Sequence, residues 1–206
     1  MGTRTRLLAL GALAVVTLVA VAVGRRTGET QVLRAAGAPP ASVVTEHDLP
    51  VLGDAPAPSL AGAAGWLNTA PLSVGMLSGK VVLYEFWTFG CINCQHTLSH
   101  VKAWYARYAA DGLVVVAVHS PEFSYEADPA NVQQYVTDQH ITYPVALDPK
   151  MAVWRAWGTR AWPTFALFDR SGRPRLRHVG EGGYEQTEDA IRALLGVAPD
   201  SPRATV

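Results

Sequence analysis

Cysteine is scarce in this sequence, with two residues among 206, and neither sign of charge is in excess, because 17 basic residues balance 17 acidic ones. Two cysteines cannot supply a set of structural disulfides, and this absence is compatible with either an oxidising or a reducing compartment. A net charge of zero provides no positive field, so we do not expect the protein to bind nucleic acid. We also find no internal repeat. A domain of about 140 residues, which this chain can accommodate, suffices for one hydrophobic core.

Cys91 and Cys94 lie three positions apart, between a predicted strand and a predicted helix. The strand, residues 81–87, is rich in β-branched and aromatic residues. After a turn at 88–90, apolar residues recur with helical spacing, at Cys94, Leu98, Val101, Tyr105 and Tyr108. Cys91 is therefore expected at a helix N-terminus, where unpaired N–H groups and the helix dipole favour a thiolate. The arrangement predicts a dithiol that closes and reopens a disulfide.

Two other uses of the cysteine pair are disfavoured by its geometry. A structural disulfide across three residues would close a very small loop and would stabilise the protein only weakly. A metal site would have to recruit His96 and His100, but on a helix these point about 160° and about 120° away from Cys94. Four ligands spread around a helix cannot converge on one tetrahedral ion. We expect no metal and no cofactor, with both histidines on the solvated face.

The residues around the cysteines resemble the thioredoxin superfamily, and more narrowly its extracytoplasmic TlpA-like branch with DipZ-type domains. The resemblance covers about residues 60–196 and implies a thioredoxin fold and thiol–disulfide exchange with proteins. It rests on short motifs that follow one another along the chain: Trp66-Leu67-Asn68, Leu77-x-Gly79-Lys80, Phe86-Trp87-Thr88-x-x-Cys91-Ile92-Asn93-Cys94-Gln95, Val118-His119-Ser120-Pro121-Glu122-Phe123, Tyr143-Pro144-Val145-Ala146-Leu147-Asp148 and Trp162-Pro163.

The rest of the pattern predicts an α/β fold with a central mixed sheet flanked by helices. Besides the strand and helix around the cysteines, the expected elements are strands at 113–118, 144–147, 164–168 and 176–179 and helices at 128–139, 149–157 and 185–195. Alternation of strands with helices implies parallel β-α-β units, and the turn at 169–172 implies a final antiparallel hairpin. Arg173, Arg175 and Arg177 alternate toward and into this last strand, an expected edge strand, where charge discourages pairing between sheet edges.

The N-terminal part of the chain, up to about residue 60, has a different composition. An uncharged stretch from Leu7 to Gly24 is long enough to cross a bilayer, whereas Ala20-Val21-Ala22 offers a weak signal-peptide cleavage site. Arg25-Arg26 behind this stretch would make an unusual mature terminus, so we favour an uncleaved single-pass anchor in the cell membrane over an exported soluble protein. The predicted organisation is an N-terminal membrane anchor or signal peptide (1–26), an Ala/Pro-rich linker (27–60), a thioredoxin-like domain (61–196) and a C-terminal tail (197–206).

Two acidic residues are candidates for catalysis. Glu85 lies six positions before Cys91, where the resemblance implies a buried aspartate beneath the disulfide, and strand alternation puts it on one face with Trp87. A buried carboxyl group can accept the proton of Cys94; the alternative is a carboxylate held by a hydrogen bond without a kinetic role. Glu122 resembles an acidic residue near the active site of TlpA-like reductases; the alternative is a solvated loop carboxylate.

Three further residues are candidates for contact with the substrate. Trp162-Pro163 matches the cis-proline loop that faces the cysteines in the resembled family, where backbone groups pair with an extended substrate strand. Without that resemblance, an ordinary trans proline at the start of a strand would be expected. Trp87 is expected in the wall around the disulfide, or else simply in the core.

Together these expectations describe an extracytoplasmic thiol–disulfide oxidoreductase, acting as a reductant, in which Cys91 attacks and Cys94 resolves. The resemblance implies a CcdA- or DipZ-like membrane electron donor, expected to be a separate protein, and work in cytochrome c maturation or thiol repair. One alternative is a thiol peroxidase, because Thr88 stands three residues before Cys91, although Tyr84 replaces the proline of peroxiredoxins. The other is a metal or haem chaperone that binds its ligand through both cysteines.

Overall fold

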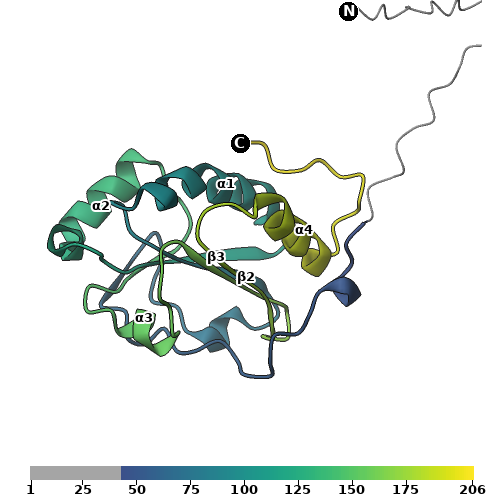
Figure 1. Cartoon of the computed structure of the whole chain (residues 1–206), viewed down its shortest axis with the longest axis horizontal. Coiled ribbons are helices and arrows are strands. Elements are labelled where there is room, and N and C mark those ends of the chain that lie inside the picture. The colour runs from purple at the N-terminus through teal and green to yellow at the C-terminus, as the bar shows by residue number, and fades with distance from the viewer. Residues whose placement is uncertain (1–42) are drawn as a thin grey trace, which may run out of the picture. The chain divides into compact units, whose positions relative to one another are not determined.

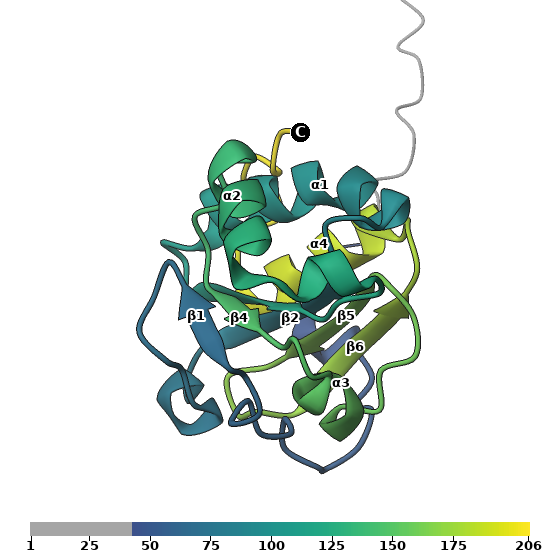
Figure 2. The same ribbon diagram turned by 90° about the vertical axis from the view of Figure 1, so that its left-hand side faces the viewer.

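A six-stranded sheet lies between two layers of helices in the computed structural model, which describes residues 43–206 (Figures 1 and 2). The strands are β1 (Gly65–Leu67), β2 (Val81–Trp87), β3 (Leu113–His119), β4 (Val145–Leu147), β5 (Thr164–Phe168) and β6 (Pro174–Val179). The helices are α1 (Ile92–Tyr108), α2 (Pro129–Asp138), α3 (Ala152–Ala156) and α4 (Tyr184–Leu195), with 3₁₀ turns at Glu46–Asp48, Val74–Leu77 and Ser124–Ala127.

The strand order is β1-β4-β3-β2-β5-β6, and β2 lies near the middle of the sheet. β2 runs parallel to β3 in a register that pairs Trp87 with His119, and antiparallel to β5 in a register that pairs Phe86 with Thr164. The carboxyl ends of parallel strands meet at one edge of a sheet. The turn toward α1 and the loop after β3 therefore leave the sheet side by side, and the residue before Thr164 lies at the same edge.

The side chains of β2 divide between two hydrophobic clusters because successive residues point to opposite faces. Leu83 and Trp87 pack with buried residues of α1, α2 and α4, whereas Tyr84 and Phe86 pack with buried residues of α3. Figure 1 shows the same division, with α1, α2 and α4 above the sheet and α3 below it. All seven residues of β2 are buried, as predicted for a strand covered on both faces.

The predicted mixed sheet and its flanking helices are confirmed, with one additional strand and one shorter helix. The strand Gly65–Leu67 was not expected, because three residues carry too little pattern; it pairs antiparallel with β4. The helix predicted over 149–157 spans only Ala152–Ala156, since Met151 before it adopts a left-handed conformation with φ 56°. Gly196, with φ 70°, ends α4 as expected.

Residues 43–60, assigned to the linker from their composition, pack against the domain. The guanidinium group of Arg175 is buried and donates hydrogen bonds to the backbone carbonyls of Glu46, Leu49 and Pro50. It also forms ion pairs with Asp169, at 3.0 Å, and with Glu46, at 3.2 Å. Ala/Pro-rich composition does not reveal contacts made through backbone carbonyls, so the domain begins earlier than residue 61. Arg175 therefore fastens a chain segment to the edge strand β6, a role that the charge pattern did not reveal.

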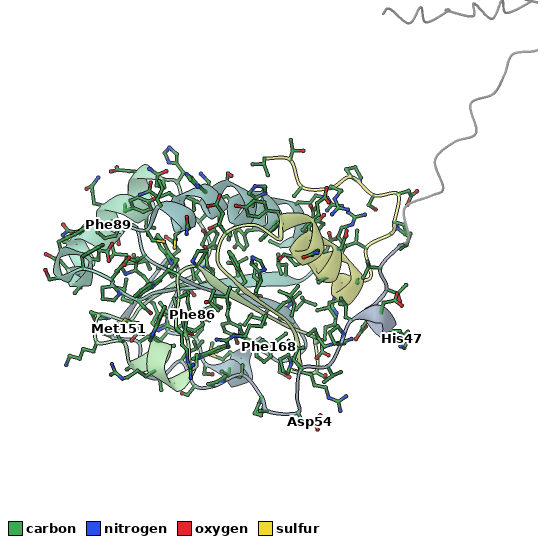
Figure 3. The ribbon with its side chains drawn as sticks, viewed as in Figure 1. His47, Asp54, Phe86, Phe89, Met151 and Phe168 are labelled. Atoms are coloured by element: carbon green, nitrogen blue, oxygen red, sulfur yellow. The ribbon has the colours of Figure 1, made fainter. Side chains whose placement is uncertain are left out.

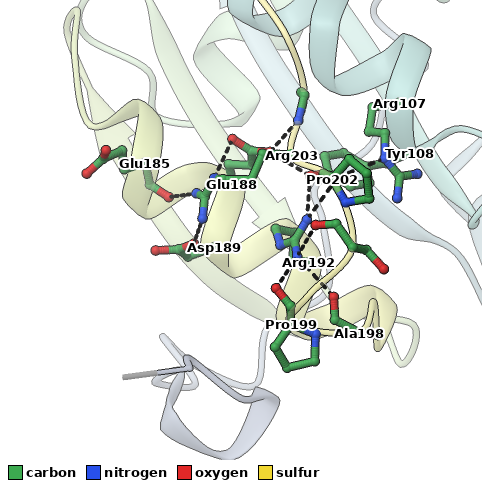
Figure 4. A network of polar contacts seen from close by, with 12 residues as sticks. Arg107, Tyr108, Glu185, Glu188, Asp189, Arg192, Ala198, Pro199, Pro202 and Arg203 are labelled. Carbon is green, nitrogen blue, oxygen red and sulfur yellow. Dashed lines mark hydrogen bonds and ion pairs between the residues drawn. The ribbon is translucent and has the colours of Figure 1, made fainter. Parts of the chain in front are cut away.

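The C-terminal tail is fastened by a second buried arginine. Arg192 of α4 donates hydrogen bonds to four backbone carbonyls of the tail and to the hydroxyl group of Tyr108 in α1. Figure 4 shows this network, in which Glu188 also accepts hydrogen bonds from Tyr108 and from the tail. Residues 198–204 therefore pack on α1 and α4.

The predicted membrane segment, residues 7–24, lies outside the described residues. From Val43 to the C-terminus, none of the helices is both long and apolar enough to cross a membrane.

Candidate active site

Cys91 and Cys94 stand at the start of α1, as the sequence predicts, with unequal burial. Cys91 is the N-cap residue of the helix, and its Sγ accepts a hydrogen bond from the backbone N–H of Cys94 at 3.4 Å. The Cys91 side chain is half-buried, whereas Cys94 is 3% exposed and belongs to the core cluster beneath α1. Both thiols are free. A partner can therefore reach Cys91 more readily than Cys94.

Burial raises the pKa of the Cys94 thiol far above its ordinary range. The hydrogen bond with Cys91 and the nearby charge of Glu85 raise it further. A thiol held in its protonated form needs a base close by before it can attack a disulfide.

Glu85 lies on the α1 face of β2, as strand alternation predicts, and is 2% exposed. Burial raises its pKa to about 8. Its charge acts on three neighbouring groups: the Cys94 thiol and the hydroxyls of Tyr135 and Tyr143. Within residues 43–206 the carboxyl group forms no hydrogen bond, so the alternative of a carboxylate fixed by hydrogen bonding finds no partner there. A carboxyl group that titrates near neutral pH suits proton transfer.

The edge of the sheet carries an aromatic cluster next to residues 88–90, the turn that leads from β2 to Cys91 and that we call the cysteine turn. Trp87 is buried and packs edge-on against His119 at 5.0 Å and beside Tyr135 at 5.8 Å between ring centroids. Phe89 stacks on the same two rings. Among the described residues, the Trp87 Nε1 atom has no hydrogen-bond partner. Trp87 thus shares a core cluster with Cys94, and its predicted place in the wall near the cysteines agrees with this packing.

The peptide bond between Trp162 and Pro163 is cis, as the resemblance implies. The sheet register puts Pro163 beside the end of β2, at the edge from which the cysteine turn leads. The indole Nε1 of Trp162 donates a hydrogen bond to the backbone carbonyl of Ser120 at 2.9 Å, and its ring stacks on Trp154 at 4.3 Å. The loop before β5 and the loop after β3 are thereby joined.

Glu122 and Glu126, in the loop after β3, have opposite surroundings. The Glu122 side chain is exposed and forms no hydrogen bond within the described part of the chain, so its catalytic role stays a prediction. The buried acidic residue of this loop is Glu126, which accepts hydrogen bonds from the backbone N–H groups of Gly90, Glu122 and Phe123. Nothing in the sequence pattern identified it as a site residue. Phe123, the N-cap residue three positions before it, has no side-chain oxygen, so the sequence signature of a capping box is absent.

His119 is a second buried residue that the sequence analysis did not single out. Its Nε2 lies 3.3 Å from the Oγ1 of Thr88, the first residue after β2. Burial lowers its pKa to about 4, so the ring is neutral at pH 7, although the charge of Glu126 opposes this shift. His119 therefore contributes a neutral hydrogen-bond partner to the cysteine turn.

The histidines of α1 have partners of their own. His96 is exposed, as expected, and its Nδ1 lies 3.1 Å from the carboxylate of Glu181. His100 is half-buried and stacks on Tyr184 at 3.6 Å between ring centroids, which corrects its expected place on the solvated face. Between Val43 and Val206, no group of three or more His, Cys, Asp and Glu side chains could hold a metal ion.

Comparisons with known proteins agree with this geometry. The Redoxin family matches residues 52–195. The chain is 44% identical over 145 residues to protein DipZ of Mycobacterium tuberculosis, an alignment that covers 69% of this chain and 21% of DipZ. The chain thus spans about a fifth of the length of that relative. The predicted resemblance to DipZ-type domains is confirmed.

Two shorter proteins are similar over nearly their whole length. The thiol-disulfide oxidoreductase YkuV of Bacillus subtilis is 29% identical over 140 residues, which cover 68% of this chain and 94% of YkuV. The crystal structure of a thioredoxin-like superfamily protein superposes with a TM-score of 0.63 at 25% identity, over 69% of this chain and 97% of that one. The predicted thioredoxin fold is confirmed.

Proposed function

The chain belongs to the Redoxin family and is a thiol–disulfide oxidoreductase, and we propose that it acts outside the cytoplasm as a reductant of protein disulfides. One observation supports this proposal most directly: a half-buried thiol caps α1 while its partner thiol lies buried beside a carboxyl group whose pKa is about 8. This arrangement separates an attacking thiol from a resolving thiol.

In the first step, the thiolate of Cys91 attacks one sulfur of the substrate disulfide. A bond forms between Cys91 and that sulfur, the substrate S–S bond breaks, and the other substrate sulfur leaves as a thiolate. The N–H groups at the start of α1 face the charge on Cys91, and one of them already binds its Sγ.

In the second step, the Cys94 thiol transfers its proton to the carboxylate of Glu85 and attacks the Cys91 sulfur. The mixed disulfide breaks and releases the second substrate thiolate. The substrate has then gained two electrons, and the protein is left with a Cys91–Cys94 disulfide. A membrane electron donor of the CcdA or DipZ kind would return the two electrons.

The remaining site residues would bind and shape the substrate. Trp162 and Pro163, at the sheet edge beside the cysteine turn, would offer backbone groups to an extended substrate segment. Trp87 would close the inner side of the site. A single-pass anchor at residues 7–24 would hold the domain at the extracytoplasmic face of the cell membrane, where cytochrome c maturation or thiol repair would use it.

The direction of the reaction is tested by measuring the reduction potential of the Cys91–Cys94 pair in glutathione buffers. A value near about −270 mV supports a reductant, and a value near about −120 mV identifies an oxidant and contradicts this proposal. A Cys94→Ser variant that keeps full peroxide turnover with an external thiol would identify a one-cysteine peroxidase instead. Stoichiometric metal or haem in the reduced, purified protein would identify a chaperone.

A further inference from the structure

Glu126 has a carboxyl group with 0% exposure that the steps above do not use. Its Oε1 accepts a hydrogen bond from the backbone N–H of Gly90 at 2.8 Å. Its Oε2 accepts from the N–H groups of Glu122, at 2.6 Å, and Phe123, at 2.9 Å. Two oxygens of one side chain thus hold two separate segments of backbone, the cysteine turn and the loop after β3.

The Gly90 contact is not needed to form the loop that carries Glu126. To close its own turn, as in a capping box, the Glu126 carboxylate needs only the N–H groups of Glu122 and Phe123. Burying a carboxylate is costly unless hydrogen bonds compensate it, and no ion pair within residues 43–206 involves Glu126. The third bond, across 36 positions of sequence, is directed at the residue before Cys91.

The absence of a side chain at Gly90 leaves room for the carboxylate of Glu126. A Cβ atom there would collide with the carboxylate of Glu126 and would lie 2.7 Å from the hydroxyl oxygen of Tyr125. Gly90 is not among the residues with positive φ, so its backbone conformation is open to other residue types. Glycine is required here by the close approach of Glu126.

Each residue of the turn before Cys91 is held by a different partner. Thr88 contacts His119, the carbonyl of Phe89 accepts a hydrogen bond from the side chain of Gln95 at 2.8 Å, and Gly90 donates to Glu126. Gly90 is directly bonded to Cys91, whose thiolate is stabilised where its Sγ accepts the N–H of Cys94. A displacement of about 1 Å in a reacting group can cost about 100-fold in rate.

We propose that Glu126 is a positioning residue for the Cys91 nucleophile: through Gly90 it fixes the cysteine turn against the loop after β3. This inference rests on the proposed function. It concerns the attack of Cys91 and not the resolution by Cys94, because the Glu126 contacts end at Gly90, next to Cys91, whereas Cys94 is held in the core cluster.

The test uses stopped-flow oxidation of the reduced protein by glutathione disulfide. Attack appears as a phase whose rate rises with disulfide concentration, and resolution appears as a phase whose rate does not. Glu126→Gln keeps one acceptor oxygen, which the two loop N–H groups retain, and turns an amide NH₂ toward Gly90. We expect the concentration-dependent phase to slow by about tenfold or more and the other phase to change by less than about threefold.

The matched control is Asp169→Asn. Asp169 is also a buried carboxylate that accepts backbone N–H groups, but it lies in the turn between β5 and β6. We expect it to leave the attack phase within about twofold of the wild-type rate. An equal slowing in Asp169→Asn would attribute the effect to general loss of stability and overturn the proposal, as would equal slowing of both phases in Glu126→Gln.

A double-mutant cycle adds a second, independent measurement. Gly90→Ala pushes the Glu126 carboxylate away while keeping its charge, and should slow attack in the same manner. Because both changes break one contact, the double variant should be no slower than the slower single variant, whereas additive losses would contradict the coupling. Wild-type protein that forms no glutathione adduct would refute the proposed function itself. Normal wild-type attack with an unchanged Glu126→Gln rate would refute only the positioning role.

Discussion

The backbone N–H of Cys94 donates a hydrogen bond to the Sγ of Cys91 over 3.4 Å. One thiol therefore caps the helix that begins beneath it, while the side chain of the other points into the core. Because the two sulfurs differ in access and in surroundings, the two halves of a thiol–disulfide exchange can be separated by substitution.

Replacing each cysteine alone should give different products. Cys94→Ser should accumulate covalent, reductant-sensitive adducts through Cys91, since attack proceeds and resolution cannot. Cys91→Ser should trap few adducts, because the remaining thiol is 3% exposed. Mass spectrometry after incubation with an oxidised protein substrate distinguishes the two, and equal trapping through Cys94 would reverse the assigned roles.

Glu85→Gln should slow resolution more than attack. The Cys94 thiol loses its proton acceptor, and removal of general base assistance costs about 10²–10⁴-fold in rate. The rate of the concentration-independent phase with glutathione disulfide provides the measurement between pH 6 and 8. If that rate is unchanged, Glu85 has a structural role only.

Glu85 should also make the stability of the reduced protein depend on pH. Its pKa is about 8 in the folded state and 4.5 ordinarily, so between these values the folded state holds a proton that the unfolded state has released. The contribution of Glu85 to stability is then greatest below about pH 4.5 and falls as pH rises toward 8, by up to about 1.4 kcal/mol per pH unit.

The contribution of His119 to stability depends on pH in the opposite direction and over a lower pH range. Its pKa falls from 6.5 to about 4 on folding, so it destabilises the protein as pH drops through that interval. Between pH 6.5 and 8 only Glu85 of this pair titrates. Urea unfolding should therefore show wild-type stability declining across this window relative to Glu85→Gln, and parallel curves for the two proteins would contradict the buried, proton-binding carboxyl group.

Arg192→Met should loosen the C-terminal tail without altering the chemistry. The change leaves four tail carbonyls without their donor, and we expect a loss of about 2–4 kcal/mol in the free energy of unfolding. Arg155→Met, on the exposed side of α3, is the matched control and should change stability by less than about 0.5 kcal/mol. The attack rate on glutathione disulfide should remain that of the wild type in both variants.

The parts of the site that could be predicted from sequence are those encoded by neighbouring residues. The strand Val81–Trp87, the N-terminal position of Cys91 and the burial of Cys94 follow from periodicity within about 20 residues. The cis bond before Pro163 was accessible only through family resemblance. In each case a short motif carries enough information to fix a local conformation.

Glu126 and His119 could not be predicted because their partners are distant in sequence. Glu122 and Glu126 are both acidic residues of one loop, and only the backbone path decides which of them turns inward to Gly90. His119 ends a continuous apolar strand, where nothing in the pattern identifies Thr88 as its partner. Figure 3 shows Phe89, which stacks on His119, at the opposite end of the domain from His47.

The five hydrogen bonds of Arg175 decide where a shortened version of this protein can begin. A truncation at residue 61, which composition alone suggests, would remove four of the five acceptors and leave the guanidinium group with Asp169 only. Losing the partners of a buried charge costs about 3–5 kcal/mol, a large share of the stability of an ordinary domain. A recombinant domain intended for crystallisation or for electrode measurements should therefore start no later than Thr45, so that Glu46 is retained together with the arginine that it covers.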